Sequence, residues 1–168
     1  MATTYAPVAT TTVSGSSTTQ ITFNSISASY SDLILVYRGK LNSQNNFYIQ
    51  FNSDTGSNYR LERMYSNPPS SASGSSFDNS LTYIYPNTSA MTNDAMLWLN
   101  INQYSNTNGT KPVLFRWSDP TQTSGYLSNS FATWNSTAAI SRIDIYATGG
   151  SNYFVAGTTI TLYQITAA

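Results

Sequence analysis

An alternation of apolar and polar residues with a period of two runs through most of this chain and constrains its fold more than any other feature. Between residues 95 and 101, Ala95, Leu97, Leu99 and Ile101 occupy every second position. Successive side chains of a β-strand point to opposite faces, so this pattern predicts strands with one buried face. No segment shows a clear helical period of about 3.6 residues. The chain is therefore predicted to be all-β.

Ten segments carry a strand pattern, and stretches rich in Gly, Asn, Asp and Ser separate them. The predicted strands are 19–23, 32–38, 47–52, 59–65, 81–85, 95–101, 113–118, 126–134, 143–147 and 158–165. The second of them is a continuous apolar run, which is expected to be buried on both faces. Regularly spaced short strands with such turns indicate an antiparallel two-sheet sandwich, jelly-roll-like, of about ten strands. Residues 18–168 are predicted to form this sandwich as a single domain.

The charge balance and hydropathy argue against two kinds of partner. Seven basic and seven acidic side chains cancel, so no net field attracts nucleic acid or an anionic membrane. The longest apolar run, Leu33 to Tyr37, is far shorter than the ~20 residues of a membrane-spanning helix. Residues 1–20 have neither a basic start nor an apolar segment, so we expect no secretory signal. We therefore predict no nucleic-acid partner and no membrane association.

Histidine and cysteine are absent, and Glu62 is the only glutamate. The chain therefore lacks an imidazole for proton transfer, a thiolate nucleophile and the usual ligands of zinc, copper or iron. A serine nucleophile would depend on Lys40 or Lys111 as its base. A glycosidase would need two carboxylates ~5–10 Å apart, and nothing in the sequence pairs any two. We predict a protein that is not an enzyme and has no catalytic, cofactor-binding or metal-binding residues.

The loop at residues 54–58, Asp-Thr-Gly-Ser-Asn, has two interpretations. Carboxylate and carbonyl oxygens are the ligands that calcium prefers. The segment nevertheless lacks the repeated acidic ligands of a dedicated calcium loop. Aspartate also stabilises turns by accepting backbone hydrogen bonds, and we favour that role for Asp54.

Two segments fall outside the strand pattern. Residues 1–17 lack a face that could pack, and they form either a loose terminus or an arm ordered on a neighbouring subunit. We expect the arm. Residues 66–79 contain two consecutive prolines, which block strand pairing, and form either a disordered loop or a contact element. The candidate contacts with other subunits or with a capsid are Tyr5, Pro7, Val8, Val13, Pro68, Pro69 and Phe77.

Two blocks of the sequence resemble a known group of proteins. Residues 51–59, Phe-Asn-Ser-Asp-Thr-Gly-Ser-Asn-Tyr, resemble the FNxDTGSNY block of small virion proteins of tailed bacteriophages. Residues 157–165 are similar to the C-terminal GTxxTLYxI block of the same proteins, and residues 31–35 look like one of their strands. Gln164 departs from the group, in which glycine is expected at that position. The resemblance implies a head decoration (cement) protein or a part of a tail fibre.

From the resemblance we expect a capsid cement protein that stabilises the phage head by binding its outer surface. Its expected partners are the major capsid protein and further copies of itself, as a homotrimer on the capsid. It is expected to reside in the virion after assembly in the cytoplasm of a bacterial host. Because no disulfide can form, its stability would depend on sheet packing and on subunit interfaces.

The alternative function is that of a tail-fibre or receptor-binding protein that recognises a host surface glycan. It predicts exposed aromatic side chains gathered at one end of the sandwich. The candidates, which lie in polar or turn-rich stretches, are Tyr104, Tyr126, Trp134 and Tyr153. Aromatic residues in such stretches also occur half-buried at the ends of sandwiches, where they have no ligand.

Overall fold

The computed structural model describes residues 5–15, 17–43, 46–67, 72–86, 94–119 and 126–166. Within these ranges the chain forms eleven strands. They are β1 (Tyr5–Thr12), β2 (Gln20–Phe23), β3 (Asp32–Gly39), β4 (Phe47–Phe51), β5 (Tyr59–Asn67), β6 (Ala72–Leu81), β7 (Ala95–Asn102), β8 (Lys111–Asp119), β9 (Tyr126–Trp134), β10 (Ile143–Ala147) and β11 (Thr159–Ile165). No helix in these ranges is long and apolar enough to cross a membrane.

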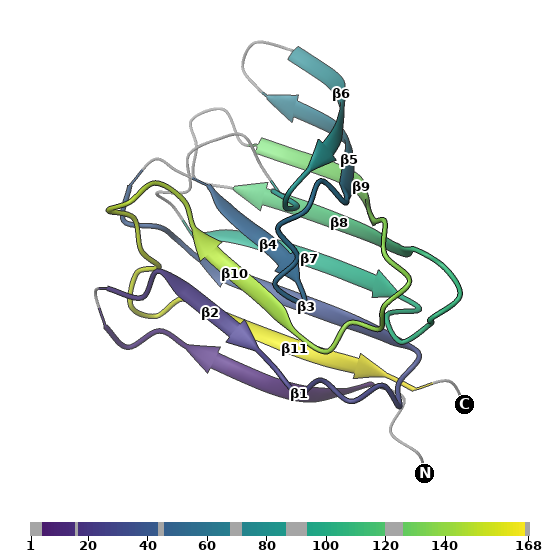
Figure 1. Ribbon diagram of the computed structural model, residues 1–168. Helices are drawn as coiled ribbons and strands as arrows, with labels where there is room; N and C mark the ends of the chain where they lie inside the picture. The colour runs from purple at the N-terminus through teal and green to yellow at the C-terminus, as the bar shows by residue number, and fades with distance from the viewer. Residues whose placement is uncertain are drawn as a thin grey trace.

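The strands form two antiparallel sheets that pack face to face. The large sheet has eight strands in the order β1-β11-β3-β7-β8-β9-β5-β6, and the small sheet has three in the order β2-β10-β4. Figure 1 shows the large sheet running from β1 at the bottom to β6 at the top, with the small sheet in front of it. The predicted all-β, antiparallel two-sheet sandwich is confirmed, with eleven strands among the described residues where about ten were expected.

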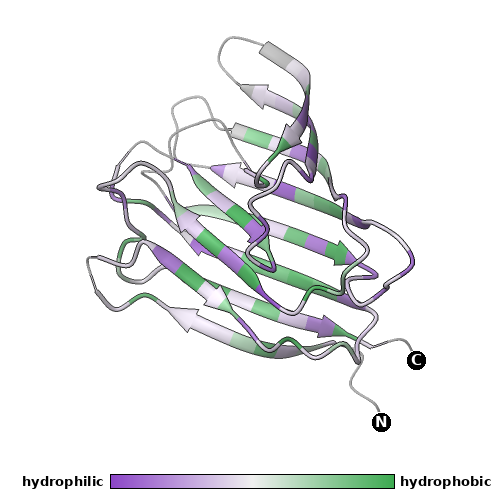
Figure 2. Ribbon diagram, viewed as in Figure 1, coloured by the Kyte–Doolittle hydropathy of each residue, from purple (hydrophilic) through white to green (hydrophobic). Residues whose placement is uncertain are grey.

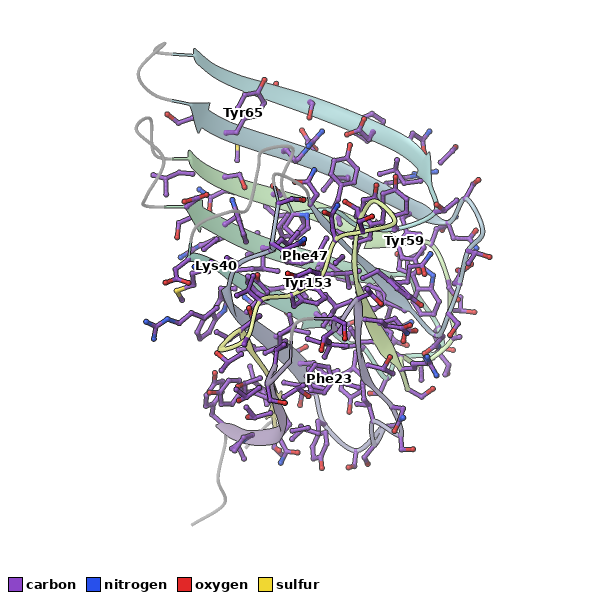
Figure 3. The ribbon with its side chains drawn as sticks, turned by 90° about the vertical axis from the view of Figure 1, so that its left-hand side faces the viewer. Phe23, Lys40, Phe47, Tyr59, Tyr65 and Tyr153 are labelled. Atoms are coloured by element: carbon purple, nitrogen blue, oxygen red, sulfur yellow. The ribbon has the colours of Figure 1, made fainter. Side chains whose placement is uncertain are left out.

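The core lies between the small sheet and the middle of the large sheet, as the period-two pattern requires. Along β7 and β8 every second residue is buried, and Figure 2 shows the same alternation of hydropathy along the strands. Aromatic rings fill much of the space: Phe47 lies 4.8 Å from Tyr37 and 6.1 Å from Trp117, measured between ring centroids. Phe23, Phe47 and Tyr59, labelled in Figure 3, are all buried. Each such side chain contributes about 1.5–3 kcal/mol to stability through its burial.

The N-terminal segment differs from its prediction. Residues 5–12 form β1, an edge strand of the large sheet that pairs with β11 from Tyr5 opposite Ile165 to Thr12 opposite Thr159. For these residues the expected arm is a strand of the chain's own sheet, and Val13, proposed as a contact, is buried; contact of the segment with a neighbouring subunit stays a prediction. The sequence concealed the strand because most of its residues are exposed, so no alternation marks it. Pairing gives partners to the backbone groups of β11, which would otherwise form the sheet edge.

The proposed contact loop at residues 66–79 is also largely strand. β5 continues to Asn67 and β6 begins at Ala72, so the segment contains both arms of a hairpin. Serine and glycine in the edge strand β6 leave no apolar period to detect. Phe77 is 64% exposed on β6, whereas Pro68 and Pro69 lie outside the described residues. Of the predicted strand at 81–85, Leu81 is the last residue of β6 and Ile84 forms an isolated bridge with Ile49.

Candidate interaction surface

The large sheet has a second side, facing away from the small sheet, which we call the outer face. Residues paired across an antiparallel sheet point to the same side, so the strand register arranges the outer face in rows. One row is Arg38, Met96, Ser118, Leu127 and Ser66; the next is Val36, Trp98, Arg116, Asn129 and Met64; the third is Ile34, Asn100, Leu114, Phe131, Glu62 and Phe77. Their neighbours along the strands, such as Leu99 and Phe115, point to the core.

Large apolar side chains gather on the outer face in contact with solvent. Met64 is 53% exposed, Phe77 64%, Met96 45%, Leu127 62% and Phe131 55%. The other large apolar residues that are exposed among the described ones are Tyr5 at 40% and Val8 at 38%, and they lie on β1. Singly exposed apolar residues are normal on soluble proteins, whereas a contiguous exposed patch marks a binding surface. The outer face is therefore the candidate functional site.

A groove of about 710 Å³ crosses the middle of the outer face over β7, β8 and β9. Its lining includes Met96, Trp98, Asn100, Arg116 and Leu127. The Nε1 of Trp98 donates a hydrogen bond to Oδ1 of Asn100 at 2.9 Å, which holds the indole ring in place on the sheet. Arg116, at the centre of the grid, is exposed. The groove thus combines an aromatic ring, an amide and a cation.

Two opposite charges of the outer face, Arg116 and Glu62, have no ion-pair partner among the residues that the structure describes. The ion pairs found among the described residues are Arg63 with Asp78 and Arg142 with Asp144, and they include neither Arg116 nor Glu62. Arg116 lies on β8 opposite Asn129 of β9, and Glu62 lies on β5 opposite Phe131 of β9. The two charges therefore flank the same strand, and both are exposed to solvent and to any partner.

The aromatic residues predicted to bind glycan are not gathered on a surface. Tyr104 and Trp134 are buried in the core, so this part of the prediction is wrong. The hydroxyl of Tyr104 donates to the carbonyl of Ser27, and Nε1 of Trp134 donates to Oδ2 of Asp54 at 2.7 Å. Their turn-rich surroundings in the sequence did not reveal that the rings point inward. Tyr153 is half-buried, and the side chain of Tyr126 lies outside the described part of the chain.

The two most heavily hydrogen-bonded carboxylates have structural roles. Asp54 accepts hydrogen bonds from the backbone N–H of Gly56 at 2.8 Å and from Asn58 and Trp134, which confirms its predicted role in the turn. Asp144 accepts hydrogen bonds from several side chains of the small sheet. Burial alone would raise the pKa of each carboxyl, but the donated hydrogen bonds outweigh it and hold each pKa below its ordinary value. Where the structure describes the chain, no three acidic side chains gather so as to hold a metal ion.

Lys111, which was considered as a base for a serine nucleophile, is buried and hydrogen-bonded to the backbone. Its Nζ donates to the carbonyl oxygens of Gly109 at 2.8 Å and of Ser136 at 3.3 Å. Burial lowers the pKa of its ammonium group. The bonds connect the turn before β8 to the segment after β9, so Lys111 stabilises one end of the sandwich.

Sequence reasoning missed the outer face, although a signal for it was present. In β7 and β8 the side chains that point away from the core include Met96, Trp98 and Leu114. In a strand with one face in solvent these positions are normally polar. Apolar residues in both phases of a strand indicate that both of its faces are covered. For β3 that conclusion was drawn from its continuous apolar run, but it was not extended to the neighbouring strands.

Comparisons with known proteins add little to this description. No protein-family model matches the chain, and no curated protein matches it. Among solved structures, the galectin LEC-6 of Caenorhabditis elegans is similar, with 10% sequence identity and a TM-score of 0.32. The match covers 96% of this chain and 91% of that one. This likeness is too low to carry information about what the chain binds.

Proposed function

We propose that this protein is a non-enzymatic structural protein of a bacteriophage virion, which attaches to the major capsid protein through its outer face. The observation that carries the proposal is the gathering of Met64, Phe77, Met96, Leu127 and Phe131, all exposed, on one side of one sheet. Burial of apolar surface contributes about 25 cal/mol per Å², so a partner that covers these side chains gains most of its affinity there.

The sequence supports the choice of a virion as the setting. The blocks at 51–59 and 157–165 resemble those of small virion proteins, and in the fold they form the Asp54 turn and strand β11. A chain without cysteine must obtain its stability from packing and from interfaces, which a shell of repeated subunits supplies. Location in the virion after assembly in the host cytoplasm, and homotrimer formation, stay predictions.

Substitution of two residues on the outer face tests this function. Leu127→Ser and Phe131→Ser each remove a large exposed apolar side chain, so each variant is expected to bind at least about tenfold more weakly to capsids. The measurement is co-sedimentation of the purified protein with particles of the encoding phage that lack it. Val8→Ser is the matched control, because Val8 is also exposed and apolar but lies on β1. Undiminished binding of both outer-face variants would contradict the proposal.

The groove favours a second candidate function, recognition of a host surface glycan by a tail-fibre protein. An indole ring can stack on the apolar face of a sugar, while the amides of Asn100 and Asn129 and the guanidinium of Arg116 hydrogen-bond its hydroxyls. In a glycan-array screen, any binding would then be lost in Trp98→Ala and kept in Tyr153→Ala. A screen with no binding by the wild-type protein would leave the capsid function as the better explanation of the outer face.

A further inference from the structure

Arg116 and Glu62 are placed on the outer face so that each can pair with the other residue of a second copy; Arg38 and Arg60 are further exposed charges of this face. Arg116 and Glu62 lie on either side of β9, on β8 and β5. Arg116 lies in the row of Asn129 and Glu62 in the row of Phe131, so a two-fold axis that lies in the plane of the face, crosses β9 between these two residues and runs oblique to the strands exchanges the two charges. The rotation therefore brings Arg116 of one copy opposite Glu62 of another, and the same pair forms a second time across the axis.

The spacing of the sheet suits such a pairing. Strands lie ~4.8 Å apart and alternate residues along a strand ~6.8 Å apart, so the Cα atoms of Arg116 and Glu62 are separated by roughly 12 Å within one chain. The two side chains do not form an ion pair within the chain. Sheets that pack face to face lie ~10 Å apart, a distance that an arginine and a glutamate reaching toward each other can span.

The apolar residues lie where the centre of this interface would be. Phe131 lies on β9 between the two charges, in the row of Glu62, and Met64 is adjacent on β5 in the row of Arg116, whereas Leu127 lies one row further along β9. The axis passes close to Phe131 and Met64, so these two apolar residues of both copies meet near the centre of the interface, with one ion pair on either side of the axis. An apolar centre with charges outside it is the ordinary anatomy of an interface between identical subunits.

The extent of the face also suits a second copy. The rows span six strands, from β3 to β6. At ~4.8 Å per strand and ~20 Å along the strands, the face covers roughly 600 Å² in projection, near the ~800 Å² that each partner buries in a stable interface. A partner of one charge sign would leave either Arg116 or Glu62 facing a like charge or none. A second copy of this chain satisfies both.

We propose that the outer face is the interface of a two-fold symmetric dimer of this chain, held by Arg116 of each copy paired with Glu62 of the other around Phe131 and Met64. This inference rests on the assignment of the outer face as a protein interface in the proposed function. It adds the identity of the partner that covers the face when no capsid is present.

Reversal of the two charges tests the dimer. Sedimentation velocity of the wild-type chain at about 1–100 µM is expected to show a monomer–dimer equilibrium. R116E and E62R each place like charges opposite each other twice, so each variant alone is expected to dimerise at least about tenfold more weakly. An equimolar mixture of the two variants should regain the dimer, because native Glu62 of one chain then meets native Arg116 of the other and the two new charges also attract.

Controls separate this pairing from general effects of charge and folding. Lys40→Glu makes the same change in net charge as R116E at a position beyond the end of β3, outside the rows of the outer face, and should dimerise as the wild type does. Since only folded chains can form the mixed dimer, recovery in the mixture also excludes misfolding of the variants. A monomeric wild-type chain at 100 µM, a mixture that stays monomeric or a Lys40→Glu variant that loses the dimer would each overturn the inference.

The dimer and the capsid function fail independently. A wild-type chain that is monomeric, yet loses capsid binding in Leu127→Ser, would overturn the dimer and keep the proposed function. A dimer that responds to the charge reversals as expected, in a protein that does not bind particles, would support the inference and overturn attachment to the capsid.

Discussion

Trp134→Ala is expected to lower the free energy of unfolding by about 4 kcal/mol, within the ~3–5 kcal/mol typical of tryptophan truncation in a core. Trp134 is buried at the end of β9, where its ring centroid lies 5.8 Å from that of Phe51 and 6.5 Å from that of Tyr59. Its Nε1 donates to Asp54 at 2.7 Å. The substitution therefore removes packing between the two sheets and a hydrogen bond to a charged turn. Urea denaturation followed by circular dichroism measures the loss.

Trp134→Phe is the matched control for the packing component. Phenylalanine keeps an aromatic ring between the sheets but cannot donate to Asp54, so we expect a loss of about 2 kcal/mol, mainly from the hydrogen bond to a carboxylate. The order of stability should therefore be wild type, Trp134→Phe and Trp134→Ala. A loss below about 1 kcal/mol for Trp134→Ala would mean that the ring is exposed, as the glycan hypothesis required.

Asp144→Asn is expected to lower stability by about 3 kcal/mol at neutral pH, because hydrogen bonds to a charged acceptor contribute ~1.5–3 kcal/mol each and are not additive. The carboxylate is buried in the middle strand of the small sheet. It accepts hydrogen bonds from Nε and NH2 of Arg142 at 2.7 and 2.8 Å and from Thr22 at 2.7 Å. Asparagine has the same shape but no charge, and its amide NH2 would face these donors.

The dependence of this difference on pH checks its electrostatic origin. Although burial acts to raise it, the pKa of Asp144 is held below its ordinary value by the hydrogen bonds from Arg142, Thr22 and Gln20. A lowered pKa in the folded state stabilises the protein above the unfolded-state pKa of about 3.9, and this contribution is lost as pH falls through the folded-state value. The gap in stability between wild type and Asp144→Asn should therefore narrow below about pH 4. A stability difference between wild type and Asp144→Asn that is unchanged between pH 7 and pH 3 would contradict an electrostatic origin. Asp54 is present in both proteins, so its own pH-dependent contribution cancels in this difference.

Prediction from the sequence succeeded for the strands that bury one face and failed for β1 and β6, the edge strands of the large sheet. β7 and β8 lie in the middle of the large sheet, and every second residue of each is buried, so the alternation of apolar and polar residues was visible in the sequence. In β1 most residues are exposed on both sides, and β6 consists largely of serine and other small or polar residues, so neither strand shows the apolar period that would have identified it. Tyr104 and Trp134 were wrongly predicted to be exposed because the residues next to them in the sequence do not reveal whether a ring points into the core or into solvent.

The sequence by itself determined which residues share a strand face, and it excluded imidazole and thiol chemistry, since both depend only on residue type and on the two-residue repeat of a strand. The tertiary structure decided which strands are edges, which rings enter the core and which exposed groups become neighbours. Arg116 and Glu62 are 54 positions apart in the chain, by subtraction of their numbers, and flank one strand only because β8, β9 and β5 are adjacent in the sheet. Strand order depends on packing across the whole domain, which no local pattern records.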